Sequence, residues 1–550
     1  MSILVFRMRL REPQHRLLVL GWTAGLLLAL SGCTSVRDYV NNGFKVGPNY
    51  APPLAEVAEH WIDSADIRTH EGEDLSRWWT VFKDPTLDRL ITSAYRQNLT
   101  LREAGFRVLE ARAQRGIAVG EVFPQQQNAT GSFQRKAVTT NTSGFSPQQQ
   151  FYDQWNSGFN LAWELDFWGR FRRAVTAADA QLNASVEGYD DVLVTLLGDV
   201  ATNYVQIRTL QARIRLLKDN VELQRWVVDL LKQRLGGGFR ATKLDVDQGI
   251  STLEQTEAQI PELEIGLQQA TNRLCVLMGT PPTDLQNLLG EDHIPSAAPG
   301  VVIGIPADLL SRRPDVRRAR YLAAAQAEVI GIAQAELYPA LSITGTLGWQ
   351  ANNFGDLFQA KSLNSNVGPA FQWNLLNYGR IVNNVRFQEA KFQELVLAYQ
   401  QTVLAADQEV EDGLVTFLRA QRREKHLATS ANAATDAVKT IFLQYQAGRA
   451  DADFNRYALI EQNRVQQQDL LAQSRGEIAL GLIQVYRALG GGWELRLAPE
   501  SEGPSPPAAP PQLPPTPDEI SLPPRVPQPP AKPELLPQPP PADAERAKDN

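Results

Sequence analysis

The stretch LDFWGRFRRA (Leu165–Ala174) has a counterpart in LLNYGRIVNN (Leu375–Asn384), and both contain an aromatic residue followed by Gly and Arg. Three further pairs of short segments recur in the same order: FPQ at Phe123 and YPA at Tyr338, RLGGG at Arg234 and QYQAG at Gln444, and VLMG at Val276 and RALG at Arg487. Self-similarity of this kind indicates an internal duplication. Each half is predicted to contain two strands, a long helix, a tight glycine turn and a returning helix.

The segments around the repeated triplets alternate between apolar and polar residues. The pattern runs through SGFNLAWELDF (Ser157–Phe167) in the first half and LSITGTLGW (Leu341–Trp349) in the second. A period of two predicts strands with one apolar and one polar face. Strands of a membrane β-barrel also alternate in this way, so the pattern alone does not separate a barrel from a half-buried soluble sheet.

The segments after the triplets predict long helices. Apolar residues there are spaced alternately by three and four, at Leu197, Val200, Tyr204, Ile207, Leu210, Ile214, Leu217 and Val221, and again at Phe392, Val396, Tyr399, Val403, Ala406, Val410 and Phe417. An average step of 3.5 is typical of a heptad seam. A second apolar set (Val194, Ala201, Val205) predicts contact with two neighbouring helices, as in a ring.

No proline interrupts the chain between Trp168 and Leu235, so this helix could extend roughly 100 Å. Pro261 is expected to kink the returning helix of the first half. A simple two-stranded coiled coil is the alternative, and the strand pairs at the far ends argue against it.

The composition gives no sign of an enzyme, a metal site or a nucleic-acid-binding protein. The net charge is −7, the five histidines have no ligand spacing, and no phosphate-binding loop or nucleophile motif is present. The basic run RRPDVRRAR at Arg312 is expected to be a solvated helix start. Cys275 lies among apolar residues and is expected to be a small buried hydrophobe.

The first 32 residues resemble a bacterial export signal. Basic residues precede the apolar run Leu17–Leu30, which is too short to span a membrane, and the run ends at Leu30-Ser31-Gly32-Cys33. This site resembles a lipobox, which implies cleavage before Cys33 and a covalent N-acyl and S-diacylglycerol lipid on that residue. An ordinary signal peptide that happens to contain a cysteine is the alternative.

The chain divides into eight predicted segments. Residues 1–32 form the signal, and 496–550 a proline-rich tail that cannot bury enough apolar area to fold. Between them lie an N-terminal segment with the first helices (33–122), a first β-hairpin (123–166), a first long helical hairpin (167–290), a linker with the repeat-start helix (291–337), a second β-hairpin (338–375) and a second long helical hairpin (376–495).

Four motifs resemble those of the outer-membrane efflux factors, which are TolC-like channels, within the lipoprotein branch that serves resistance-nodulation-division pumps. They are KVGPNYAPP at Lys45, WWTVFKDPTLDRLITSAYRQN at Trp78, RRPDVRRARYLAAAQAEVIGIAQAELYPALSITG at Arg312 and YRALGGGW at Tyr486. The resemblance covers nearly all of the chain from Cys33 to Trp493. The long spacer between Cys33 and Val46 and the proline tail depart from the family pattern.

The resemblance implies a mainly α-helical chain that forms a homotrimer. Twelve strands, four from each chain, would make a β-barrel in the outer membrane, and a long α-helical barrel would continue it through the periplasm. Four strands are too few to close a barrel alone, and open edges cannot survive in lipid, so the strand count also predicts self-assembly. The heptad seams are taken as further support, so that Leu217→Asp should abolish the trimer.

The helix–helix turns at Gly236–Gly238 and Gly448 are expected to form the periplasmic end. GRADADFNRY follows the second turn, and Asp451 and Asp453, repeated by three-fold symmetry, are candidates for acidic rings at a constriction. Arg449 and Arg456 are candidates for ion pairs that hold a closed state. The alternative is that the carboxylates only cap the following helix.

The sequence therefore predicts a passive exit duct for small molecules, anchored by lipid in the outer membrane. It requires no cofactor or enzyme activity, and its partners are two further copies, a periplasmic adaptor and an inner-membrane pump. A type I protein-secretion conduit and a structural periplasmic coiled-coil lipoprotein remain alternatives.

Overall fold

The computed structural model describes residues 36–497 except 71–73, 138–150, 238–240, 291–292, 297–299, 303–305, 448 and 450–452. All described residues belong to one compact unit. Cys33, Gly238, Gly448, Asp451 and the proline-rich tail lie outside the described residues.

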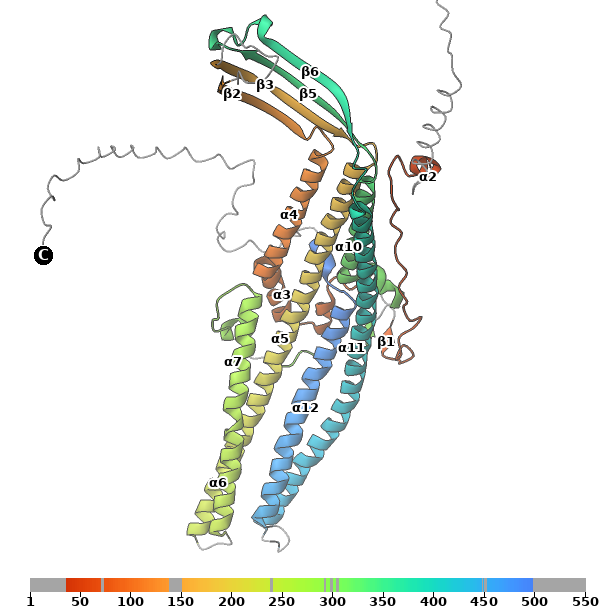
Figure 1. Ribbon diagram of the computed structural model, residues 1–550. Helices are drawn as coiled ribbons and strands as arrows, with labels where there is room; N and C mark the ends of the chain where they lie inside the picture. The colour runs from red at the N-terminus through yellow and green to blue at the C-terminus, as the bar shows by residue number, and fades with distance from the viewer. Residues whose placement is uncertain are drawn as a thin grey trace, which may run out of the picture. The chain divides into compact units, whose positions relative to one another are not determined.

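The two halves of the chain contain matching long helices, which confirms the duplication. Helix α5 (Arg170–Gly236) and helix α11 (Arg380–Gln446) each have 67 residues. Gly169 and Gly379 precede them with φ of 82° and 80°, a left-handed conformation that strains other residues. The repeated aromatic-Gly-Arg triplet is therefore the corner at which a strand segment turns into a long helix (Figure 1).

The four predicted strands form one antiparallel sheet in the order β2-β3-β5-β6. These strands are β2 (Gln126–Ala137), β3 (Phe151–Leu165), β5 (Ala340–Ala351) and β6 (Leu363–Gln372). Trp163 lies opposite Ile343, and Glu164 lies opposite Ser342, so apolar and polar residues fall on opposite faces of the sheet. Strands β2 and β6 each pair with a described strand on one side only.

Helices of each half flank the sheet at the corresponding positions of the repeat. Helix α4 (Leu99–Gly120) precedes β2, as α10 (Pro314–Ala335) precedes β5. The returning helices are α6 (Lys243–Glu257) with α7 (Gln259–Leu277) in the first half, and the unbroken α12 (Phe454–Ala488) in the second. Figure 1 shows the sheet at one end of α5 and α11 and the interhelical turns at the other.

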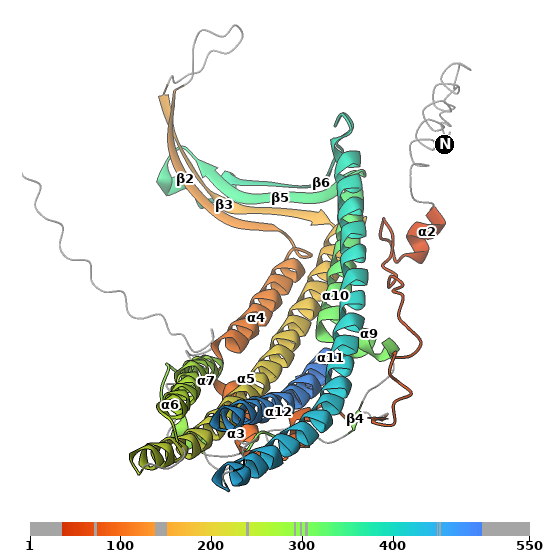
Figure 2. The ribbon, with the colours of Figure 1, turned by 90° about the horizontal axis from the view of Figure 1, so that it is seen from below.

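The remaining elements are short, apart from α3 (Pro85–Gln97). They are α2 (Val36–Asn41), η1 (Trp78–Phe82), α8 (Gln286–Leu289), η2 (Pro306–Asp308), α9 (Leu309–Arg312), η3 (Phe354–Asp356), η4 (Ala360–Ser362), η5 (Trp493–Leu497) and the parallel pair β1 (Thr69–His70) and β4 (Val301–Val302). Helix α5 contacts α4, α10, α6, α7 and α12, whereas α11 contacts mainly α10 and α12 (Figure 2). Among the described residues, no helix has both the length and the apolar character needed to cross a bilayer.

The returning helix of the first half is interrupted close to the predicted position. Helix α6 ends at Glu257 and α7 begins at Gln259, with Ala258 between them. Pro261 has no N–H to donate to the carbonyl of Glu257, which explains the break one turn before it.

The heptad seams pack inside one chain, so they do not support the predicted trimer. Leu217 is 2% exposed and packs with Ile214, Leu263 and Val465. The second apolar set, Val194, Ala201 and Val205, is buried in the same chain. The prediction that Leu217→Asp tests the trimer is therefore wrong. The periodicity predicts a packed helix, but it does not show which helices this helix packs against.

The basic run at Arg312 begins a helix, but the expectation that it is solvated is wrong. Arg313 is 8% exposed; it donates to the backbone oxygen of Ala488 at 2.6 Å and contacts Glu409 at 2.9 Å. Arg317 lies 2.6 Å from Glu187 and over the ring of Trp493. Acidic partners distant in the sequence make it possible to bury these cations.

Candidate functional site

The α11–α12 turn carries the predicted gate residues. The Asp453 carboxylate accepts a hydrogen bond from the backbone N–H of Arg456 at 2.8 Å and so caps α12. The backbone N–H of Arg449 donates to the oxygen of Gln444 at 3.2 Å. The structure thus brings Asp453 and Arg456 together through the cap, while Asp451 lies outside the described residues. The side chains of Arg449, Asp453 and Arg456 are all exposed.

The α5–α6 turn ends in a comparable cap. The Thr242 side chain accepts from the N–H of Asp245 at 3.2 Å, and the Asp245 carboxylate accepts from the N–H of Thr242 at 2.8 Å. This reciprocal pair satisfies two backbone donors at the start of α6. Both turns therefore present a carboxylate at a helix N-terminus, where the helix dipole favours negative charge.

Aromatic side chains join the two hairpins next to these turns. Phe442 of α11 lies 5.6 Å from Trp226 of α5 and 5.7 Å from Tyr457 of α12, measured between ring centroids. Phe454, which is 3% exposed, contacts Tyr445 and Tyr457. Burial, followed by the nearby Glu461 carboxylate, raises the pKa of Tyr457, so its phenol is neutral at physiological pH. Sequence reasoning missed this cluster because the aromatic residues come from three separated helices.

A buried ion pair follows the aromatic cluster along α12. Glu461 is 1% exposed and Arg464 is 9% exposed, and the guanidinium of Arg464 donates to the Glu461 carboxylate. It also donates to the side-chain oxygen of Asn220 on α5 at 2.8 Å. Removing one partner of such a pair leaves a buried charge and typically costs about 3–5 kcal/mol. The two hairpins are therefore fixed to each other by polar as well as aromatic contacts near the turns.

Three of the motifs quoted above converge in the main core. The ring of Trp78 stacks on Tyr486 at 5.8 Å, and Arg313 donates to the backbone oxygen of Ala488. Asp84, in the same motif as Trp78, caps α3 and accepts a hydrogen bond from the Tyr204 hydroxyl at 2.6 Å. These segments share one core although they lie hundreds of residues apart.

The fourth motif, at Lys45, fixes the chain to the start of α5. Arg173 is fully buried and donates to the backbone oxygens of Val46 and Gly47 at 2.7 and 2.9 Å. Its guanidinium also pairs with Glu328 of α10 at 2.7 Å. The motif therefore contacts α5 through Arg173, which in turn binds α10. Within the described ranges, no group of His, Cys, Asp or Glu side chains is arranged to hold a metal ion.

Comparison with known proteins identifies the family. The profile of the outer membrane efflux protein family matches residues 90–280 and 305–491, which is more than half of the chain. The chain belongs to the outer membrane efflux protein family. The two matched ranges fall in the two halves of the internal repeat.

Individual relatives in this family cover most of the chain. It is 31% identical to the pyoverdine export outer membrane protein OpmQ of Pseudomonas aeruginosa, over 77% of this chain and 89% of the relative. It is 28% identical to the outer membrane protein OprJ of Pseudomonas aeruginosa, over 82% of this chain and 93% of the relative. The solved structure of the outer-membrane channel OprN is similar, with a TM-score of 0.77, 29% identity, and coverage of 82% of this chain and 99% of that chain.

Proposed function

We propose that three copies of this chain form the outer-membrane channel of a tripartite efflux system. The channel is a passive exit duct for small molecules, which an inner-membrane resistance-nodulation-division pump delivers through a periplasmic adaptor. It performs no chemistry and needs no cofactor. The observation that carries the proposal is a four-stranded sheet with two open edges, joined directly to two helices of 67 residues.

The open edges support assembly with further copies. In lipid, each unpaired backbone group costs several kcal/mol, and four strands cannot close into a barrel. Because all three strand pairs are antiparallel, β2 and β6 run in opposite directions. Strand β6 of one copy can therefore pair with β2 of the next in the same antiparallel manner. Three copies would give the twelve strands that the family resemblance implies.

The long helices support a periplasmic extension of the same duct. A 67-residue helix spans roughly 100 Å, far more than a bilayer requires. The interhelical turns then lie deep in the periplasm, where an adaptor and a pump can reach them. The names of the relatives OpmQ and OprJ both describe outer membrane proteins, which supports placing the sheet of this duct in the outer membrane.

The position of α2 supports a lipid anchor on Cys33. The Tyr39 hydroxyl donates to the backbone oxygen of Phe167 at 2.6 Å, immediately after the end of β3. Five residues lie between Cys33 and Tyr39, and because residues 36–39 belong to α2, the path spans at most roughly 15 Å, so a lipid on Cys33 would lie close to the end of the sheet. Mass spectrometry of the mature N-terminus should show an acylated Cys33, and an unmodified terminus elsewhere would contradict the anchor.

Transport measurements test the proposal. Deleting the gene should raise the intracellular level of dyes or antibiotics without changing the set of secreted proteins. The purified protein should be a trimer in detergent and should conduct ions in a planar bilayer. Loss of one secreted protein would favour a secretion conduit instead, and a stable monomer without conductance would reject the duct.

A further inference from the structure

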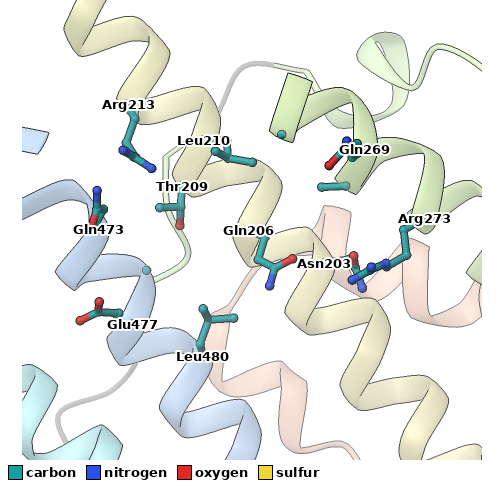
Figure 3. Close-up of a pocket in the computed structure, with 13 residues that line it drawn as sticks. Asn203, Gln206, Thr209, Leu210, Arg213, Gln269, Arg273, Gln473, Glu477 and Leu480 are labelled. Carbon is teal, nitrogen blue, oxygen red and sulfur yellow. The ribbon is translucent and has the colours of Figure 1, made fainter. Parts of the chain in front are cut away.

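A cavity of about 410 Å³ lies where α5, α7 and α12 meet, away from the turns and the sheet (Figure 3). Its size falls in the range of pockets that hold drug-sized molecules. The residues that line it include the polar side chains of Asn203, Gln206, Arg213, Gln269, Arg273 and Gln473.

Close helix contacts build the walls of this cavity. A Cβ atom added at Gly476 of α12 would lie 2.3 Å from the Thr209 hydroxyl of α5, so only glycine permits this approach. Gly266 of α7 faces the side chain of Leu210 on α5, with a closest distance of 3.6 Å from an added Cβ. One edge of the cavity is therefore a close approach of α5 and α12 at Gly476.

The charges around the cavity leave one cation without a partner. Arg213 forms two hydrogen bonds with Asp469 at 2.6 and 3.0 Å, and Glu477 pairs with Arg423. Arg273 of α7 lines the cavity from its exposed rim and forms no ion pair or hydrogen bond with any described residue. The open side of the cavity thus carries a guanidinium without a partner among the described residues, which suits bidentate binding of a carboxylate.

A buried acceptor lies beside this cation. Asn203 is 4% exposed; its side-chain N–H donates to the backbone oxygen of Asp199 at 2.8 Å, whereas its side-chain oxygen has no partner among the described residues. Figure 3 shows Arg273 extending from α7 toward Asn203 on α5. A buried oxygen without a partner is costly, and a ligand N–H or O–H would satisfy it.

The cavity lies on a different side of α5 from the segments that contain Asp84, Leu289 and Gly290. Tyr204 and Arg208 lie roughly 100° or more around the helix from Asn203 and Arg213, and they bind Asp84 and the backbone oxygens of Leu289 and Gly290.

We propose that this cavity is a binding site for small organic molecules that carry a carboxylate. Arg273 would hold the carboxylate, and Asn203 would accept a hydrogen bond from an N–H or O–H group of the same molecule. Gln206 and Gln269 add amide groups that adapt to different solutes. Binding to the cavity does not depend on the proposed duct.

Equilibrium dialysis of the full-length protein in detergent tests the site. The probe is 7-methoxycoumarin-4-acetate, with its neutral amide as the matched ligand. The wild-type protein should bind the acid saturably and at least about tenfold more tightly than the amide. Arg273→Gln should weaken binding of the acid about tenfold or more, because a hydrogen-bonded charge is lost. The affinity of Arg273→Lys for the acid should lie between those of the wild type and Arg273→Gln.

Arg112→Gln is the control, because Arg112 is exposed on α4, outside the cavity, and has the same charge. It should bind the acid as the wild type does. Equal binding of the acid by wild type and Arg273→Gln, equal binding of acid and amide, or no saturable binding would each overturn the proposal. Conductance of the same preparations in a bilayer distinguishes the binding site from the duct. A protein that conducts ions but does not bind the acid would reject only the site, and a protein that binds the acid but does not conduct would reject only the duct.

Discussion

Asp453 combines a helix cap with a charge, and two substitutions can separate these properties. Asn is as good a cap as Asp, so Asp453→Asn should leave thermal stability nearly unchanged. Asp453→Ala removes the bond to the Arg456 N–H and should cost about 0.5–2 kcal/mol, measured by chemical denaturation of the helical signal. Equal stability of all three proteins would show that the cap contributes nothing.

The charge at this turn is tested by conductance. Carboxylates repeated around a three-fold axis repel one another by roughly 1 kcal/mol per close pair at high dielectric and attract cations into a narrow mouth. The double variant Asp451→Asn, Asp453→Asn should therefore lower cation selectivity in single-channel recordings and weaken block by multivalent cations. Unchanged selectivity would leave Asp453 as a helix cap only and would exclude both carboxylates from ion selection.

Asp407 should make stability depend on pH. Burial, then the Glu411 carboxylate, raises the pKa of Asp407, and Arg313 only partly opposes this shift. Because the pKa of Asp407 is higher in the folded than in the unfolded chain, its contribution to the free energy of unfolding is present at low pH. This contribution declines as the pH rises from the unfolded pKa of about 3.9 through the pKa in the folded state. Asp407→Asn should therefore raise the melting temperature relative to wild type more at pH 7.5 than at pH 4. Exposed Asp412→Asn should show no such difference, and a constant offset for Asp407→Asn would contradict the shift.

At the scale of elements, Leu217 tests the packing of α5. Leu217→Asp places an unpaired carboxylate among Ile214, Leu263 and Val465 and should cost several kcal/mol. Leu223→Asp is the matched control on the same helix, because Leu223 is 37% exposed in the chain. Thermal unfolding by circular dichroism should show a large loss for the first variant and a small one for the second. Similar losses would mean that the two positions are equally buried.

The sequence predicted elements better than it predicted their partners. The heptad spacing through Leu217 correctly predicted a helix, and the alternation through Trp163 correctly predicted a strand. Both patterns depend only on residues that are close together in the sequence. The packing of Arg313 and the free guanidinium of Arg273 were missed, because their surroundings come from distant segments. A run of arginines gives charge without revealing that Glu409 and Glu187 neutralise it.

At the scale of the whole molecule, the C-terminal end of the described chain sets how far a truncation can go. Arg496 binds Asp190, which is fully buried on α5, at 2.7 and 2.9 Å. A chain ending at Leu497 keeps this pair and should still form trimers, since a proline-rich tail contributes no core. A chain ending at Gly492 leaves Asp190 without Arg496 and should assemble poorly. Native mass spectrometry in detergent measures the fraction of trimer for both truncated chains. If the chain that ends at Leu497 did not assemble, the proline-rich tail would be needed for packing.

The burial of both heptad seams inside one chain has a kinetic consequence. Helical hairpins that find their partners within the same chain can fold in a first-order reaction, whereas closing a barrel from open edges needs encounters between copies. During refolding into detergent, the helical signal should rise at a rate independent of protein concentration, and the trimer should form later at a rate that increases with it. The cell would then hold a pool of single chains with finished helices and exposed strand edges, and the supply of such chains would set the pace at which new ducts appear.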